Sequence, residues 1–313
     1  MIIDLPSTST EAVAKKLVKI RDTGGANTLG RVLTLVVIAD EGEPTEGAIA
    51  AANAASREHP CRVIVVSRGN RSATARLDAQ VRIGGDAGAS EVVILRLYGE
   101  LAEHAENVIT PFLLPDTPIV AWWPGEAPQR PAADPVGKLA TRRITDATRS
   151  SDVAQVLASR LENYTPGDTD LAWSQTTQWR ALLASALDQP PHDAITSATV
   201  IAPADYASGD LIAGWLRSAL QVPVQRRVGS FETILERADG PLRLEVDNLG
   251  NAVLAIPGKP DGRIAMRTPD IAPCLAEELR HLDEDEIYHL ALLGVADLER
   301  CDGATVAQSG GAA

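Results

Sequence analysis

The histidines, cysteines and carboxylates are the residues of this chain best suited to chemistry, and their spacing matches no known catalytic motif. No histidine belongs to an HExxH motif or adjoins a Ser or Cys in a nucleophile motif, and the sequence GxSxG does not occur. The five histidines are scattered: His59, His104, His192, His281 and His289. The three cysteines lack CxxC spacing, which argues against a disulfide framework or a zinc site: Cys61, Cys274 and Cys301. We therefore expect no catalytic residue and no metal ligand.

One acidic stretch, LDEDEIY, lies between His281 and His289 and offers imidazoles together with carboxylates. These groups can bind a metal ion. Acidic residues in the first turn of a helix also complement the helix dipole, and we prefer that interpretation.

A bound nucleotide would require a glycine-rich turn after the first buried strand, where backbone N–H groups can hold phosphate. The turn in this position reads ADEGEPTEG, so Asp40, Glu41, Glu43 and Glu46 would surround a phosphate with like charge. The other glycine-rich turn, RIGGDAGAS, precedes a strand instead of a helix. We predict no bound cofactor.

Tryptophan is the remaining unusual feature, and the stretch PIVAWWPGEAP sets Trp122 beside Trp123. Neighbours on a strand point to opposite faces of the sheet. Each ring removes ~200 Å² from water when it is buried, so we expect both to be covered. The cover is either a helix of a second domain or a partner protein.

Two further stretches combine tryptophan with arginine, namely DLAWSQTTQWRAL with Trp173 and GWLRSAL. Neighbours on a helix project about 100° apart and therefore form two faces. We expect the residues of these two stretches in the core or at a domain junction, and the WWPG turn near a binding surface. The candidates for a partner interface are Trp122, Trp123, Pro124, Gly125, Trp179, Arg180, Trp215 and Arg217.

Composition excludes several classes of partner. The 313 residues carry a formal net charge of −13, which opposes binding to the phosphates of nucleic acid. The amino terminus lacks the pattern of a secretory signal, and the longest apolar run, LVVIA, is too short to span a membrane. We expect a cytoplasmic protein that binds neither nucleic acid nor membranes.

The first half of the chain predicts a layered α/β domain with a mostly parallel or mixed sheet. A helix over 7–25 opens with a capping box of Thr8 and Glu11. Apolar, β-branched runs predict buried strands, and RLDAQVRI alternates like a strand near an edge. The expected strands are 31–40, 61–66, 76–83, 91–99, 118–123 and 143–148, and the expected helices are 45–57, 100–113 and 152–163.

The stretch NYTPGDTD marks a domain boundary, because it combines Pro, Gly and acidic residues between two helical patterns. We predict an amino-terminal α/β domain over 1–165, a carboxy-terminal α/β domain over 166–300 and a disordered tail over 301–313. The second domain should contain a β-α-β group, then an antiparallel meander with Gly- and Asn-containing turns, and carboxy-terminal helices.

Six stretches of the chain carry a resemblance to a known family: GRVLTLVVIAD, EVVILRLYGELAEHAENVITPFLLPDTPIVAWWPGEAP, RRITDAT, DLAWSQTTQWRALLASALD, LIAGWLRSAL and CLAEELRHLDEDEIYHLAL. With these stretches the chain resembles the OpcA family of glucose-6-phosphate dehydrogenase assembly proteins. The WWPG element and the spaced tryptophans of DLAW and QWR are the most specific. The richness in Ala, Arg and Asp is similar to the actinobacterial branch.

The resemblance implies a non-enzymatic factor without a cofactor. Its partner would be glucose-6-phosphate dehydrogenase, the NADP-reducing entry step of the oxidative pentose phosphate pathway. The factor would act as an allosteric activator that promotes the active oligomer. Cysteines carry redox control in the cyanobacterial branch, but those of this chain do not match them. Two alternatives stay open: a sugar-phosphate- or nucleotide-binding enzyme or metabolite sensor, and an inert scaffold.

Overall fold

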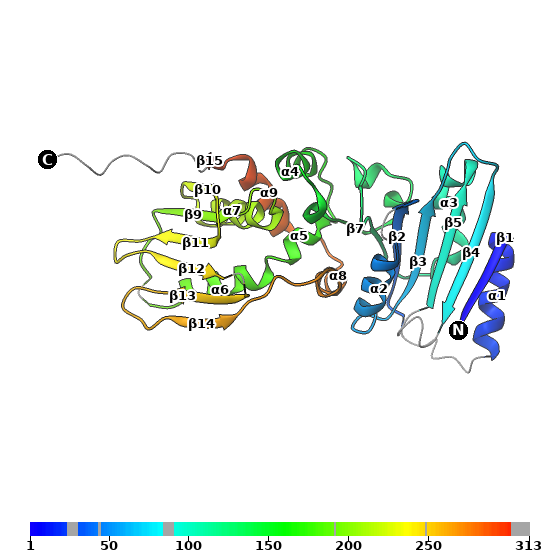
Figure 1. Ribbon diagram of the computed structural model, residues 1–313, viewed down its shortest axis with the longest axis horizontal. Coiled ribbons are helices and arrows are strands. Elements are labelled where there is room, and N and C mark those ends of the chain that lie inside the picture. Colours follow the sequence, from blue (N-terminus) through cyan, green and yellow to red (C-terminus); the bar gives the residue numbers. More distant parts are fainter. Residues whose placement is uncertain (24–30, 43–44, 84–90, 191, 248, 302–313) are drawn as a thin grey trace. The chain divides into compact units, whose positions relative to one another are not determined.

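Two β-sheets organise the chain in the computed structural model (Figure 1). The structure describes residues 1–23, 31–42, 45–83, 91–190, 192–247 and 249–301. One sheet belongs to each of two compact units, and each unit combines three separate segments. Unit 1 comprises Met1–Asp146, Asn163–Ser174 and Asp270–Asp285; unit 2 comprises Ala147–Glu162, Gln175–Pro269 and Glu286–Ala313. The predicted domain limits at residues 165 and 300 describe segments that fold independently of each other. A division of the structure into compact units does not test independent folding, so these limits stay a prediction. From residue 302 on, the predicted tail lies outside the described residues.

The sheet of unit 1 is mixed, with the strand order β1-β4-β5-β3-β2-β6-β7-β8. Parallel pairing connects β5, β3, β2, β6, β7 and β8, whereas β4 runs antiparallel to both β5 and β1. The strands are β1 (Ile2–Thr8), β2 (Leu33–Asp40), β3 (Cys61–Arg68), β4 (Arg76–Ile83), β5 (Glu91–Tyr98), β6 (Ile119–Trp122), β7 (Arg142–Thr145) and β8 (Asp168–Asp170).

Both faces of this sheet are covered, which is why β2, β3 and β5 are apolar along nearly their whole length. One apolar cluster joins the sheet to α1 (Thr10–Thr23), to α3 (Ala105–Ile109) and to η3 (Thr110–Phe112). The other joins it to the alanine-rich α2 (Thr45–Ala55) and to α8 (Ile271–Arg280). The segment that carries α8 is far away in the sequence, and it completes the core of unit 1.

Three details of unit 1 differ from the sequence-based expectations. The edge strand β1 was not expected, because its residues are largely exposed and include Pro6, which an edge strand tolerates. Helix α1 is capped by Ser9, whose Oγ accepts a hydrogen bond from Ala12 N at 3.2 Å, and not by a box of Thr8 and Glu11. The helix expected over 100–113 is broken into η2 (Gly99–Ala102), α3 and η3, the last of which begins at Thr110-Pro111.

Unit 2 contains a sheet with the order β14-β13-β12-β11-β9-β10-β15. As predicted, β9 and β10 are parallel across the helix α7, and β11 to β14 form an antiparallel meander. The strands are β9 (Ser197–Ala202), β10 (Val224–Val228), β11 (Phe231–Glu236), β12 (Leu242–Val246), β13 (Asn251–Ala255), β14 (Gly262–Ala265) and β15 (Glu299–Cys301). The helices are α4 (Val153–Glu162), α6 (Thr177–Leu187), α7 (Ala207–Leu220) and α9 (Glu286–Ala296).

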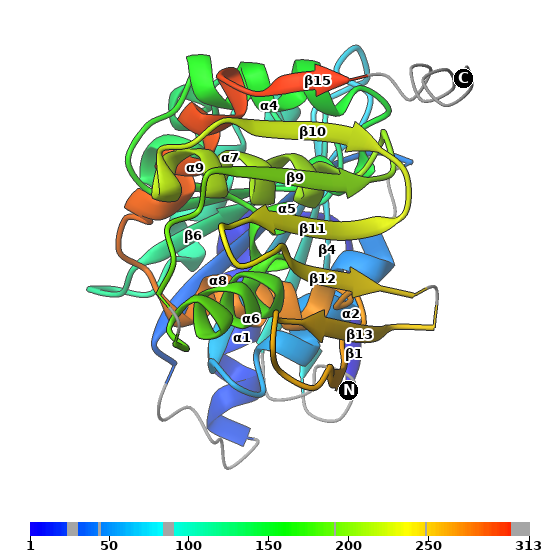
Figure 2. The same ribbon diagram turned by 90° about the vertical axis from the view of Figure 1, so that its left-hand side faces the viewer.

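The strands of unit 2 alternate between buried and more exposed residues, because α6 and α7 cover one face of the sheet. Figure 2 looks onto the other face. Helix α4 precedes the predicted boundary stretch NYTPGDTD in the sequence, and it belongs to unit 2, where it packs on α9. The predicted class, two layered α/β domains with carboxy-terminal helices, is confirmed. Within the described ranges, no helix has both the length and the apolar character needed to cross a membrane.

Candidate functional site: an aromatic groove in unit 2

The two adjacent tryptophans of the WWPG element point to opposite faces of the unit 1 sheet, as predicted. Trp122 belongs to the apolar cluster that includes α8, and Trp123 to the cluster that includes α1. Both side chains are fully buried, and Pro124 is buried as well. Gly125 is partly exposed. Direct contact between either indole and a partner would require a change of conformation, so the role of WWPG at an interface stays a prediction.

Residues of unit 1 bury both tryptophan rings. Part of the core around Trp123 is the segment 136–140, and a Cβ added to Gly137 would lie 3.3 Å from the Trp123 ring. Helix α8, from the second half of the sequence, completes the cluster of Trp122.

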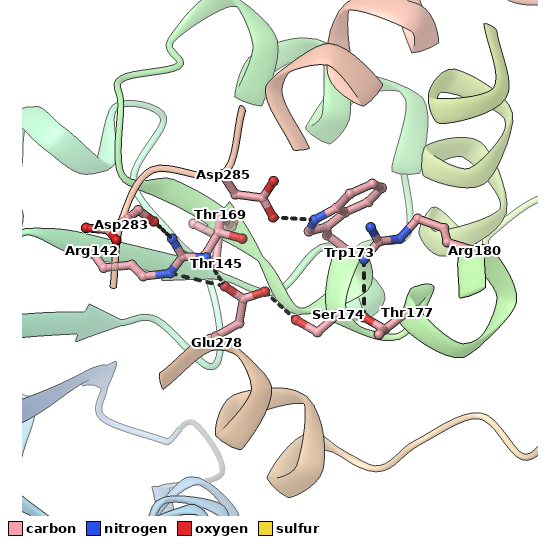
Figure 3. Close-up of polar contacts among 10 residues, drawn as sticks. All are labelled: Arg142, Thr145, Thr169, Trp173, Ser174, Thr177, Arg180, Glu278, Asp283 and Asp285. Carbon is pink, nitrogen blue, oxygen red and sulfur yellow. Dashed lines mark hydrogen bonds and ion pairs between the residues drawn. The ribbon is translucent and has the colours of Figure 1, made fainter. Parts of the chain in front are cut away.

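The DLAW motif takes part in a buried polar network that holds the segment 270–285 on unit 1 (Figure 3). Arg142 on β7 donates to one carboxylate oxygen of Glu278 at 2.5 Å, and Ser174 donates to the other at 2.5 Å. Arg142 also donates to the carbonyl of Asp283 at 2.5 Å, and Trp173 Nε1 donates to Asp285 at 2.7 Å. These residues brace the fold. Sequence reasoning missed the Arg142–Glu278 pair, because 136 positions separate its members.

The turn after β2 is acidic, as the sequence indicates. Asp40 accepts from Arg68 at 2.8 Å, and both oxygens of Glu46 accept from Arg82 at 2.8 and 3.0 Å. The hydrogen bond from Arg82 holds the pKa of Glu46 below its usual value. Glu43 lies outside the described residues.

The corresponding position in unit 2 is filled by side chains of the protein itself. Open α/β sheets bind ligands beyond the carboxyl ends of their parallel strands. Here Arg226 donates to the carbonyls of Ala202 and Pro203 at 2.9 and 2.7 Å, just past the end of β9. Arg226 also pairs at 2.6 Å with Asp210, in the first turn of α7, and Arg300 donates to the same carboxylate at 2.7 Å. A buried acid thus occupies the helix start that a phosphate would need.

Unit 2 has a groove of about 330 Å³ with an aromatic floor. Trp179, Tyr206 and Phe231 line it: the Tyr206 and Phe231 rings meet edge to face at 4.8 Å, and those of Trp179 and Phe231 lie 6.4 Å apart. The whole chain has five Trp, four Tyr and two Phe, so this concentration is unusual. Trp179 is fixed by a hydrogen bond from its Nε1 to Thr233 Oγ1 at 3.0 Å.

One rim of the groove is a braced hairpin turn between β12 and β13. The carboxylate of Asp247 accepts from the backbone N–H groups of Leu249 and Asn251, each at 2.8 Å, and from the Asn251 side chain at 2.9 Å. These bonds, that from the Asn251 side chain foremost, lower the pKa of Asp247. Gly250 has a φ of +78°, and an added Cβ would meet Arg267 Cγ at 2.6 Å. The turn therefore holds Leu249 in place while 77% of it is exposed.

The predicted interface residues fall into two groups in different units. Trp179 and Trp215 both belong to the core region of unit 2, Trp179 buried and Trp215 partly buried at its margin. Arg180 is partly exposed and donates to Thr176 and Thr177 at 2.8 and 3.2 Å, whereas Arg217 is partly exposed on α7. Of the eight predicted residues, Trp179 alone lines the groove. Sequence reasoning missed Tyr206, Phe231 and Leu249, which lie on separate segments.

No group of three or more His, Cys, Asp or Glu residues suited to a metal ion occurs in the described part of the chain.

Comparison with known proteins covers most of the sequence. Residues 52–162 match the family model described as the glucose-6-phosphate dehydrogenase subunit N-terminal domain, and residues 166–292 match the corresponding C-terminal domain. No curated protein matches the chain.

Two solved structures show distant similarity. An oxidoreductase from Sinorhizobium meliloti is 9% identical with a TM-score of 0.41, covering 85% of this chain and 96% of that one. A structure titled "Trehalose-6-phosphate from E. coli bound with UDP-2-fluoro glucose" is 10% identical with a TM-score of 0.25, covering 62% of this chain and 64% of that one. Scores this low carry no argument about function.

The fold and the site define a two-unit α/β protein whose buried charges brace its own backbone. The two matched domains make the assignment specific: the chain belongs to the OpcA family of glucose-6-phosphate dehydrogenase assembly proteins.

Proposed function

We propose that this protein is a non-catalytic assembly factor that binds glucose-6-phosphate dehydrogenase and stabilises its active oligomer. It would thereby act as an allosteric activator and support NADPH production in the cytoplasm through the oxidative pentose phosphate pathway. The match of both halves of the chain to domains of this family carries the proposal. A non-catalytic role also fits the charged groups at the two positions where α/β sheets commonly bind phosphate, because they are paired within the fold: buried Asp210 with Arg226, and exposed Glu46 with Arg82.

The mechanism follows from binding linkage. A protein can activate an enzyme only by binding its competent state more tightly than its incompetent state. A hundredfold preference corresponds to about 2.7 kcal/mol, which a few well-packed apolar contacts can supply.

Complex formation is the first test of this proposal. The purified protein is mixed with the dehydrogenase of the same organism, and mass photometry records the masses present. We expect a new species that contains both proteins and a higher-order dehydrogenase. If each protein keeps its own mass across the titration, the proposal fails for this partner.

The aromatic groove favours a second candidate function, a metabolite sensor for a sugar phosphate or nucleotide. Its volume of about 330 Å³ lies at the small end of the range for ligand pockets, and Arg267 on its rim can pair with a phosphate. Thermal shift with glucose 6-phosphate, NADP and ATP separates the two functions. A ligand at one hundred times its Kd adds about 2.7 kcal/mol to the free energy of unfolding. A shift that Arg267→Ala abolishes would favour the sensor, and unchanged melting with all three ligands would count against it.

A further inference from the structure

We infer that the outward face of α9 in unit 2 is a docking surface for an amphipathic helix with an apolar face and basic residues near both of its ends. This inference rests on the proposed function, in which the dehydrogenase supplies that helix. We call Ile287, Leu290 and Leu293 the α9 stripe.

Helix α9 is apolar around nearly its whole circumference. Its inner face packs on α7 and contains the buried residues Tyr288, Ala291, Leu292, Gly294 and Val295. The α9 stripe lies beside this face, since Ile287 and Gly294 are seven residues apart and share a side of the helix, and its residues have exposed fractions of 46%, 46% and 45%. Figure 2 shows α9 beside α7 at the margin of unit 2. A helix that is apolar all round is normally buried on all sides, so the stripe is an apolar face that still requires a cover.

The stripe cannot turn inward, because the crossing of α7 and α9 is too close. A Cβ on Gly214 would lie 2.2 Å from the carbonyl oxygen of Ala291, and a Cβ on Gly294 would lie 2.0 Å from that of Gly214. The two backbones therefore leave no room for a side chain at either glycine, and only this rotation of α9 about its axis fits the crossing. The exposure of the stripe is therefore a feature of the packed state.

A groove of about 340 Å³ adjoins the stripe. It lies between α4 and α9, and its apolar lining includes Leu157, Leu161, Leu292 and Val295. Ala296 also lines the groove, three residues after Leu293, and residues at this spacing are neighbours on a helix surface. A stripe beside a groove matches the mode in which an amphipathic helix inserts spaced apolar side chains into a partner.

Charge at the two ends of the stripe specifies the occupant. Exposed Glu286 precedes the stripe, and exposed Asp297 and Glu299 follow it. Arg300 also lines the groove, but its guanidinium is paired with Asp210 at 2.7 Å. A bound helix therefore gains from Lys or Arg near each of its ends. A second copy of this chain is disfavoured, because antiparallel pairing of two α9 helices would place Glu286 against Asp297.

The test measures the Kd for the dehydrogenase by biolayer interferometry with the full chain. Leu290→Glu and Leu293→Glu change exposed side chains and should preserve the circular dichroism spectrum and melting temperature. We expect each to weaken binding at least tenfold. Val18→Glu is the matched control, since Val18 is 53% exposed on α1 of unit 1, and it should leave the Kd unchanged.

A second variant tests the charge component separately. Glu286→Gln combined with Asp297→Asn should weaken binding and reduce its dependence on salt. Unchanged Kd values for both leucine variants, alongside normal binding by the wild type, would overturn the inference and leave the proposed function standing. Failure of the wild type to bind would overturn both. A dimer of this chain that Leu290→Glu dissociates would make a second copy the occupant and contradict the inference.

Discussion

At the scale of single residues, Glu278 should contribute strongly to the free energy of unfolding. It is buried, and it accepts hydrogen bonds from a guanidinium on β7 and a hydroxyl on α5 (Leu171–Ser174). Loss of its charge would leave Arg142 buried without its counter-ion, which typically costs about 3–5 kcal/mol. This cost is roughly a third of the free energy of unfolding of a typical domain.

Glu278→Gln should therefore lower the free energy of unfolding by roughly 3 kcal/mol. Urea denaturation followed by circular dichroism measures the change. Glu277→Gln is the control on the same helix: Glu277 is more exposed and pairs with Arg280, so its loss should cost below about 0.5 kcal/mol. Equal effects of the two substitutions would contradict this account.

Cys274 provides a prediction that depends on pH. Burial, with a further contribution from Glu278, raises the pKa of its thiol to about 12. An unfolded thiol titrates near ~8.5. The contribution of Cys274 to stability is therefore complete below about pH 8.5 and declines as the pH rises towards 12. Cys274→Ala should lose less stability between pH 8 and about pH 10 than the wild type.

Thiol reactivity checks the burial directly. In a C301S variant, Cys61 and Cys274 remain, and both are buried. We expect no reaction with Ellman's reagent at about pH 8 in buffer and full reaction of both thiols in guanidinium. Rapid native reaction of either thiol would show that unit 1 opens.

At the scale of elements, the crossing of α7 and α9 depends on glycine. Gly214→Ala should destabilise the protein by roughly 1–3 kcal/mol or more, because the new methyl group meets backbone atoms at 2.2 Å. Gly47→Ala is a matched substitution on α2, where an added Cβ meets nothing within 4 Å, so helix propensity should stabilise the protein by about 0.5–1 kcal/mol. Thermal unfolding compares the two. A Gly214→Ala variant as stable as the wild type would refute the close crossing.

The elements also show how far sequence patterns can predict this fold. Continuous apolar runs identified β2, β3 and β5, and turn residues identified the meander, because local periodicity reports burial directly. The edge strand β1 was not predicted, because an exposed strand has little hydrophobic pattern in its sequence. The groove was not predicted either. Trp179 was a candidate residue, but tertiary packing alone brings Tyr206, Phe231 and Leu249 to it. The adjacent tryptophans were expected to be covered, and a sheet packed on both faces buries both, while their role near a partner surface stays a prediction.

For the whole molecule, the interleaving of the two units has a testable consequence. Helix α8 completes the apolar cluster on one face of the unit 1 sheet, although it follows residue 270 in the sequence. A fragment of residues 1–165 would lack α8 and strand β8, so that only α2 would cover that face.

We therefore expect the 1–165 fragment to bind the dye ANS and to lack a cooperative thermal transition. Co-expression with a fragment of residues 166–313 should restore both a cooperative transition and low dye binding. If the 1–165 fragment unfolds cooperatively by itself, the predicted domain limit at residue 165 is correct and α8 is dispensable for unit 1.

The most direct test of the central claim is dehydrogenase activity at a fixed enzyme concentration, titrated with this protein while mass photometry follows the complex. The account predicts a saturating rise in rate that tracks the fraction of dehydrogenase in the complex. A complex that forms without any change in rate would contradict it and favour an inert scaffold.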